Sequence, residues 1–183
     1  CCREFLQLPL DPEAWAFVLG GGTWYCTFSY AATVPDDDPV VTLQNMSAVA
    51  MALGECLDDP EGAMHCLKEM LKIAESTGRM VENVLDDIIV FCQNHRQFAR
   101  EGLEAVDRLL NEFKSDEPVD LLMAELDRAE FLTHLGRGQE ARDIFERALA
   151  TVGRADVDPE LREMVYNRWE DWKETVAETS TPE

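Results

Sequence analysis

Positive charge is scarce in this sequence. It has 16 Lys and Arg residues against 37 Asp and Glu residues in a chain of 183, so the formal net charge is −21. Proteins that bind nucleic acids or anionic membranes need clustered Lys and Arg, and we therefore expect neither partner. The shortage does not indicate disorder, because 46% of the residues are hydrophobic and the chain is long enough to bury a core.

The sequence also lacks the motifs that carry common enzymatic chemistry. It contains no Gly-x-Ser-x-Gly, no phosphate-binding loop and no dinucleotide-binding fingerprint, and the glycine run Gly20–Gly22 has no lysine at the required spacing. Its carboxylate clusters lack the pattern of a calcium loop, and we interpret them as solvated segments. We therefore expect no catalytic residue, no cofactor and no metal site. The clusters are Asp36–Asp38, Asp58–Asp59 and Asp86–Asp87.

The six cysteines do not resemble the framework of a disulfide-rich secreted domain. They are scattered, and four of them lie in segments with apolar periodicity, so we expect reduced, mostly buried thiols in a cytoplasmic protein. The first residue is not Met and no leader-peptide pattern is visible, so we expect a fragment or a processed chain. The cysteines are Cys1, Cys2, Cys26, Cys56, Cys66 and Cys92.

Charged residues are absent from Ala14–Pro35, a run of 22 positions that is long enough to cross a membrane. Its glycines, threonines and tyrosines make it only moderately hydrophobic, so a buried helical hairpin or strand pair fits better than a span. We therefore expect an N-terminal segment over residues 1–40, either a divergent hairpin or a short pair of strands.

Helical hydrophobic periodicity recurs every 39 residues. Each unit has a second helical segment that follows a first one, and the first segments of the first two units cover about 43–57 and 80–95. Equal spacing across three units indicates an array of helical hairpins. The second segments share a small residue followed by two apolar residues at i+4 and i+7: Ala63, Leu67 and Met70; Gly102, Val106 and Leu109; and Ala141, Phe145 and Ala148.

The third unit, residues 122–150, resembles a tetratricopeptide repeat. In that family a helix ending in Leu-Gly precedes a helix with Ala, an aromatic residue and Ala at this spacing. The sequence departs from the family at Glu125, Arg128 and Gly138, where Trp, Leu and an aromatic residue are usual. The resemblance implies an all-α, right-handed array of about three hairpins. The matching residues are Ala129, Leu132, Leu135, Gly136, Ala141, Phe145 and Ala148.

The tripeptide Asp-Pro-Glu begins at residues 11, 59 and 158 and predicts three helix starts. Asp caps free N–H groups, Pro suits the first turn and Glu favours the positive end of the helix dipole. The last start predicts a helix to about Ala177 that covers the final hairpin. We therefore expect a repeat domain over 41–177 and a disordered tail over 178–183. The inward stripe of the last helix is Leu161, Met164, Val165, Trp169, Trp172 and Val176.

The resemblance also implies a function, because the first helices of such arrays line a concave groove that holds a peptide or protein segment. None of the corresponding positions here is Lys or Arg, so we expect a basic partner with apolar anchors. The alternative is that the N-terminal segment covers this groove. The positions are Val84, Asp87, Phe91, Asn94, His95, Met123, Leu126, Glu130, Thr133 and His134, and less securely Asn45, Ala48, Ala52, Glu55 and Cys56.

Two groups of residues could form a metal site. Cys92 and His95 with His65 and Cys66 could supply four zinc ligands. However, Cys92 and Cys66 fall on apolar stripes, and His95 shares one repeat position with Cys56 and His134. Equivalent positions of stacked repeats lie about 10 Å apart, so we interpret the four residues as buried thiols and solvated histidines. The pair at residues 1 and 2 resembles the end of a SEC-C-type zinc motif. An alternative function is therefore the helical part of a larger zinc-binding accessory protein whose metal motif is missing here. A third alternative is an enzyme with an unrecognised site.

Overall fold

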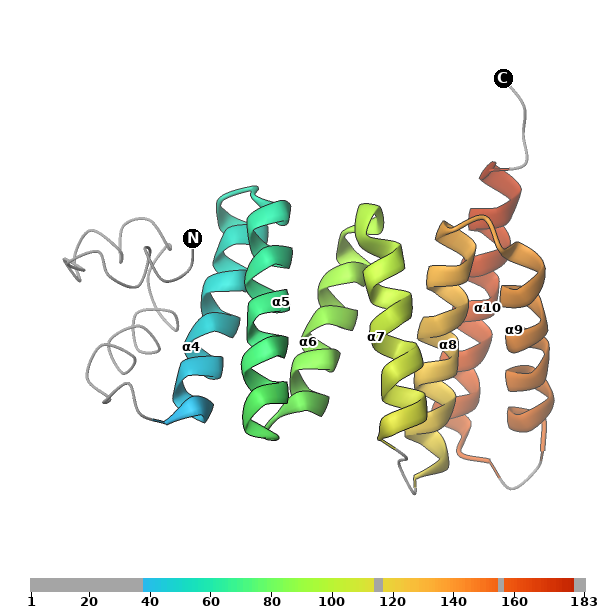
Figure 1. Ribbon diagram of the computed structural model, residues 1–183. Coiled ribbons are helices and arrows are strands. Elements are labelled where there is room, and N and C mark those ends of the chain that lie inside the picture. The colour runs from blue at the N-terminus through green and yellow to red at the C-terminus, as the bar shows by residue number, and fades with distance from the viewer. Residues whose placement is uncertain (1–37, 114–116, 155–156, 180–183) are drawn as a thin grey trace. The chain divides into compact units, whose positions relative to one another are not determined.

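The computed structural model describes residues 38–113, 117–154 and 157–179, and over these ranges the chain forms helices and no strands (Figure 1). The all-α prediction is therefore confirmed for this part of the chain. The predictions made for residues 1–37 lie outside the described residues. These are the divergent hairpin, the first Asp-Pro-Glu helix start and the cysteines at positions 1, 2 and 26.

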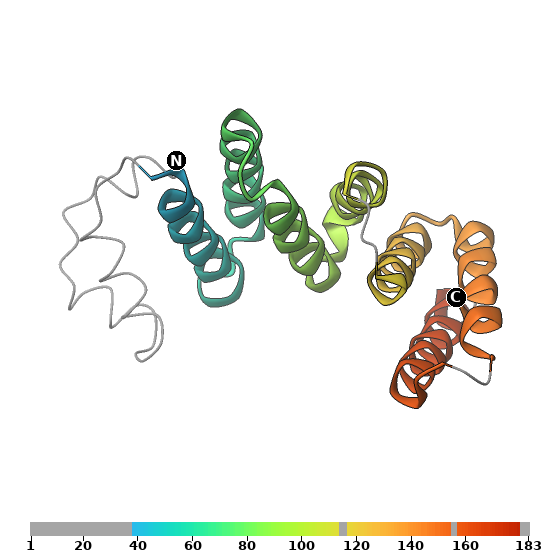
Figure 2. The same ribbon diagram turned by 90° about the horizontal axis from the view of Figure 1, so that it is seen from below.

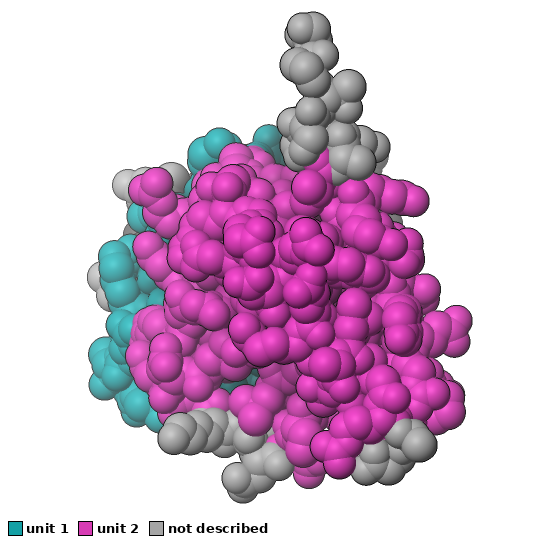
Figure 3. All heavy atoms as spheres, turned by 90° about the vertical axis from the view of Figure 1, so that its right-hand side faces the viewer, with its two compact units in different colours: residues 1–87 teal, residues 88–183 magenta. Residues whose placement is uncertain are grey.

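The chain divides into two compact units, Cys1–Asp87 and Ile88–Glu183, which Figure 3 colours separately. In unit 1, α4 (Pro39–Met51) continues into a π-helical turn, η1 (Ala52–Cys56), and both pack against α5 (Pro60–Thr77). The first predicted hairpin is therefore present. Its buried apolar side chains include Leu43, Met46, Ala48, Val49, Ala63, Met64, Cys66, Leu67, Met70 and Ala74.

Unit 2 begins within α6. In it α8 packs against both α7 and α9, while α10 packs against α9 and α8 (Figure 2). A short 3-10 turn, η2, precedes α7. The elements are α6 (Val81–Asn94), η2 (Arg96–Phe98), α7 (Ala99–Glu112), α8 (Pro118–His134), α9 (Gly138–Val152) and α10 (Pro159–Thr179).

The predicted helix signals act as expected where they are described. The side chain of Asp59 accepts a hydrogen bond from the Gly62 N–H (2.9 Å), and that of Asp158 accepts one from the Glu160 N–H (2.8 Å). The turn after α8 contains Gly136 at φ +75°, a backbone conformation that glycine adopts without strain. Capping and turn chemistry thus place the helix ends.

The small and apolar residues predicted at equivalent repeat positions are buried, with one exception. Leu109 is only half-buried, because it lies near the end of α7. One further prediction is wrong: Met164 is 44% exposed, although we expect it in the inward stripe of the last helix. In addition α10 continues through Thr179, so that two residues of the predicted disordered tail are helical.

Gly102 allows α7 to approach α8 closely. A Cβ atom at this position would lie 2.5 Å from two ring carbons of Phe131 and 2.8 Å from the Cβ of Cys92. The Phe131 side chain is 0% exposed, so its ring has little space in which to move. Packing therefore requires glycine at position 102.

We expect Gly102→Ala to lower the free energy of unfolding by about 2 kcal/mol, because overpacking outweighs the better helix propensity of alanine. Gly138→Ala is the matched control, since a Cβ there would meet nothing within 4 Å, and we expect it to be neutral or stabilising by up to about 1 kcal/mol. Urea unfolding followed by circular dichroism measures both. Equal midpoints for the two variants would contradict the packing argument.

Candidate partner-binding surface

In unit 1 most side chains at the predicted groove positions are buried or contact another helix of the chain. Val84 is 1% exposed and forms part of the core. The Ser47 hydroxyl of α4 donates a hydrogen bond to Asp87 Oδ2 of α6 (3.0 Å). Burial raises the pKa of Asp87, although the hydrogen bond from Ser47 opposes that shift. Asp87 therefore contacts α4.

The less securely predicted groove positions on α4 and η1 differ in their exposure to solvent. Ala48 and Ala52 are buried, Asn45 is half-buried and Glu55 is exposed. The side chain of Cys56 lies outside the described residues. Of this set, only the half-buried asparagine and the exposed carboxylate are available to a partner.

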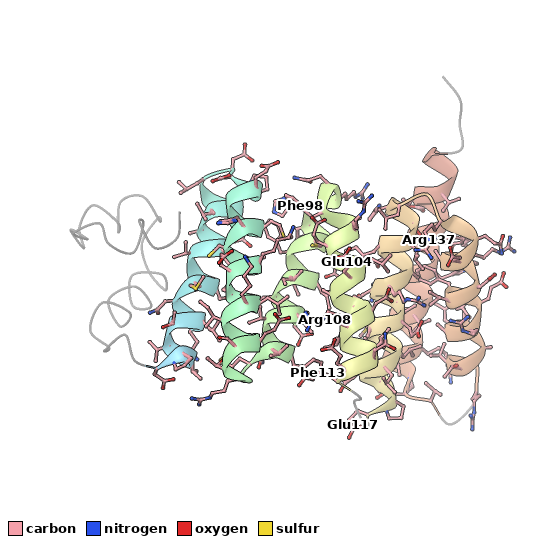
Figure 4. All side chains as sticks on the ribbon, viewed as in Figure 1. Phe98, Glu104, Arg108, Phe113, Glu117 and Arg137 are labelled. Carbon is pink, nitrogen blue, oxygen red and sulfur yellow. The ribbon has the colours of Figure 1, made fainter. Side chains whose placement is uncertain are left out.

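The end of α6 that belongs to unit 2 carries a small aromatic cluster. The Phe91 ring lies 4.3 Å from the His95 ring and 5.8 Å from the Phe98 ring, measured between centroids. Figure 4 labels Phe98, which ends η2 immediately before α7. Phe91 and His95 are half-buried and Asn94 is exposed. This end of α6 therefore combines partly exposed aromatic and polar groups.

One arginine links α8 to α10. Arg168 Nη2 lies 2.7 Å from Asp127 Oδ1 and 2.6 Å from Glu130 Oε1, and its Nε donates a further hydrogen bond to Glu130 Oε1 (2.9 Å). Gln93 of α6 also donates to Asp127 Oδ1 (2.8 Å). The side chains of Arg168 and Asp127 are 15% and 19% exposed. The cluster is therefore largely withdrawn from solvent.

Burial dominates the electrostatics of this cluster. It raises the pKa of Asp127 and the pKa of Glu130, although the Arg168 guanidinium opposes both shifts. Burial also works against the charge of Arg168, but Glu130 and Asp127 outweigh it and raise the pKa of that guanidinium. The arginine thus compensates two carboxylates that are costly to bury.

Aromatic packing supports the same contact between α8 and α10. Trp172 Nε1 donates a hydrogen bond to Thr133 Oγ1 (2.8 Å). The Trp172 ring stacks on the Trp169 ring at 4.8 Å, and both lie within 6 Å of the Phe145 ring, at 5.4 and 5.8 Å between centroids. Lys173 lies 5.7 Å above the Trp169 ring. These contacts fasten α10 to the last hairpin.

The groove positions predicted in the third repeat therefore lie in three different environments. Leu126 is 0% exposed and belongs to the core, whereas Glu130 and Thr133 are held by α10. Met123 and His134 are half-buried. Burial lowers the pKa of His134, and the charge of Arg96 lowers it further.

Sequence reasoning missed the residues that organise this surface: Gln93, Asp127 and Arg168. A signal did exist, because Arg168 and Trp172 lie four residues apart on the helix that was expected to cover the last hairpin. That pattern does not name the partners of the arginine, which lie 38 and 41 residues earlier in the chain.

Over the described ranges, no three His, Cys, Asp or Glu side chains gather in a way that could hold a metal ion. Among the same residues no helix has both the length and the hydrophobicity needed to cross a membrane. Cys66 and Cys92, which were weighed as zinc ligands, are buried, and the Cys66 thiol donates a hydrogen bond to the Met46 carbonyl (3.4 Å).

Comparison with known proteins yields no match among family models, curated proteins or solved structures.

We expect Arg168→Met to lower the free energy of unfolding by about 3 kcal/mol, because it keeps the apolar stem but leaves two buried carboxylates without a counter-ion. Arg142→Met is the control, since Arg142 pairs with Glu146 on the exposed face of α9, and its loss should cost less than about 1 kcal/mol. Denaturant titration compares the two variants. A similar small cost for both would show that the cluster does not hold α10.

The raised pKa of Glu130 predicts a pH dependence. A carboxyl group whose folded-state pKa is raised adds stability below its ordinary pKa, and that stability is lost as the pH rises through the folded-state pKa. The difference in unfolding free energy between wild type and Glu130→Gln should therefore fall as the pH rises from the ordinary pKa of Glu through the raised folded-state pKa. For Glu140→Gln the difference should rise instead, because the hydrogen bond from Arg137 lowers the pKa of Glu140. Unfolding measured at several pH values tests these opposite signs.

Proposed function

We propose that this chain is a non-catalytic protein-interaction module, a right-handed tetratricopeptide-like array closed by α10. It would hold a peptide or protein segment against the first helices of its hairpins. The observation that carries this proposal is a set of side-chain contacts that join α4 to α6, α6 to α8, and α8 to the closing helix α10. The residue separations of these contacts lie near the repeat of 39: 40 for Ser47–Asp87, 34 for Gln93–Asp127, 41 for Asp127–Arg168 and 39 for Thr133–Trp172.

These contacts support the proposal because they hold first helices next to one another within each unit. Within unit 2 the residue numbers increase together along α8 and α10, from the Asp127–Arg168 pair to the Thr133–Trp172 pair, so the two helices run parallel. The second helices α7 and α9 pack against α8. On α8, the side chains of Asp127, Glu130 and Thr133 contact α6 and α10 instead.

The chemistry of these first-helix positions suggests the partner. They carry carboxylates, amides and aromatic rings but no Lys or Arg, and the chain as a whole has a formal net charge of −21. A basic segment with apolar anchors would match this surface in charge. Such a protein would be a binding module whose specificity depends on side chains of α6, α8 and α10.

Two asparagines allow a matched test of which face binds. Asn94 ends α6 and Asn111 lies near the end of α7, both are exposed, and each donates its side-chain amide to a backbone carbonyl four residues earlier. Peptides selected from a random phage-displayed library against the full chain serve as the probe. We expect Asn94→Lys to weaken their binding about fivefold by charge repulsion, and Asn111→Lys to leave it unchanged.

Titration of the selected peptides in solution gives these affinities. Equal weakening by both substitutions would indicate diffuse attraction to an acidic protein, and no weakening by Asn94→Lys would place the peptides elsewhere. Either result contradicts the proposed use of the first helices.

A further inference from the structure

The geometry of unit 2 points to a specific docking stripe, which we propose binds a basic amphipathic helix. The stripe consists of Val119 and Met123 on α8 and Met164 on α10. This inference rests on the proposed interaction function and identifies the part of the surface that receives the partner.

The ion pair between Asp127 and Arg168 brings the stripe together. Side chains four residues apart lie on the same face of a helix. One turn before Asp127 on α8 lies Met123, and one turn before Arg168 on α10 lies Met164. Because the two helices are parallel and their side chains meet at 2.7 Å in the ion pair, we expect the two methionines to occupy neighbouring positions one turn earlier. Val119 extends the row by another turn of α8.

The exposure of these side chains is the second observation. Val119 is 45% exposed, Met164 is 44% exposed and Met123 is half-buried. Hydrophobic periodicity placed Met164 in the buried stripe of its helix, yet it lies outside the core formed by Val165 and Trp172. Methionine side chains are flexible and polarisable, and they adapt to the shape of a bound helix.

The charges around the stripe define the partner. Asp120 on α8 and Glu160 and Glu163 on α10 are exposed at its borders. The nearby Arg162 is directed to backbone instead, where it donates to the carbonyls of Val152, Arg154 and Val157. Arg168 is already bound by two carboxylates. An apolar stripe bordered by carboxylates therefore favours a ligand that combines apolar side chains with Lys or Arg.

α8 already packs against one helix of this kind, α10. α10 lies along α8 and presents Arg168 between the apolar side chains of Val165 and Trp172. A partner helix with the same alternation of apolar and basic residues would pack by the same rules against the stripe, with its apolar side chains on the methionines.

The experiment uses a fluorescently labelled synthetic helix of about 14 residues, roughly four turns, with Leu on one face and Lys elsewhere. Its binding to the full chain is followed by anisotropy. We expect Met164→Lys to weaken binding about tenfold. Met51→Lys is the matched control, because Met51 is also 44% exposed and precedes the acidic residues Glu55 and Asp58; it should change the affinity less than about twofold. Peptides with Leu→Ser or Lys→Glu should bind much more weakly.

Val119→Lys provides a second variant on the other helix, and circular dichroism shows whether each variant is folded. Equal weakening by Met164→Lys and Met51→Lys, or no weakening by either stripe variant, overturns the inference. If the wild type is a dimer that Met164→Lys converts to a monomer, the stripe is an interface between copies of the chain and the inference is also overturned. Sensitivity to Asn94→Lys without sensitivity to the stripe variants would leave the proposed function standing and remove only this docking site.

Discussion

Arg168 lies between two carboxylates of α8, and this contact sets the register of α8 and α10. Asp127 and Glu130 are about one turn apart on α8, so a single guanidinium binds both only at one axial position of α10. Trp172 repeats that register one turn later through its hydrogen bond to Thr133. This register determines which residues of α10 lie next to which residues of α8 before and after the contact.

Local signals made most of the helices predictable. Capping by Asp59 and Asp158 and the glycine turn after α8 depend on residues a few positions apart, and the structure bears them out. The periodicity also groups Ala63 and Ala141 with the small residue at position 102, which is buried as they are. The aromatic ring that requires it, Phe131, belongs to the next hairpin and left no local signal.

The surface was less predictable because it depends on how neighbouring helices rotate against one another. Val84 and Leu126 were carried over as groove positions, but both are buried. The side chain of a residue at the border between the core and the groove can be buried or exposed, and the packing of the next helix determines the outcome. Met164 shows the reverse case, since a position that fits the apolar stripe of α10 lies outside its core. Both errors arise at borders, whereas the centres of the predicted stripes are correct.

The balance of acidic and basic residues also differs between the two units. Between residues 38 and 87 there are ten Asp and Glu against three Lys and Arg, whereas the described part of unit 2 has 19 against 11. In unit 2 many carboxylates face an arginine: Glu112, Asp107, Glu140, Glu146, Asp127 and Glu130 all have such a partner.

Net charge therefore says little about where a basic partner would bind unit 2, because compensated carboxylates attract it weakly. Electrostatic attraction sets the rate and orientation of encounter more than the final affinity. Buried apolar area supplies most of the affinity of a helix in a groove. On unit 2 these two roles fall to different residues: Glu160 and Glu163 on α10 would guide a basic helix, and Val119, Met123 and Met164 would hold it.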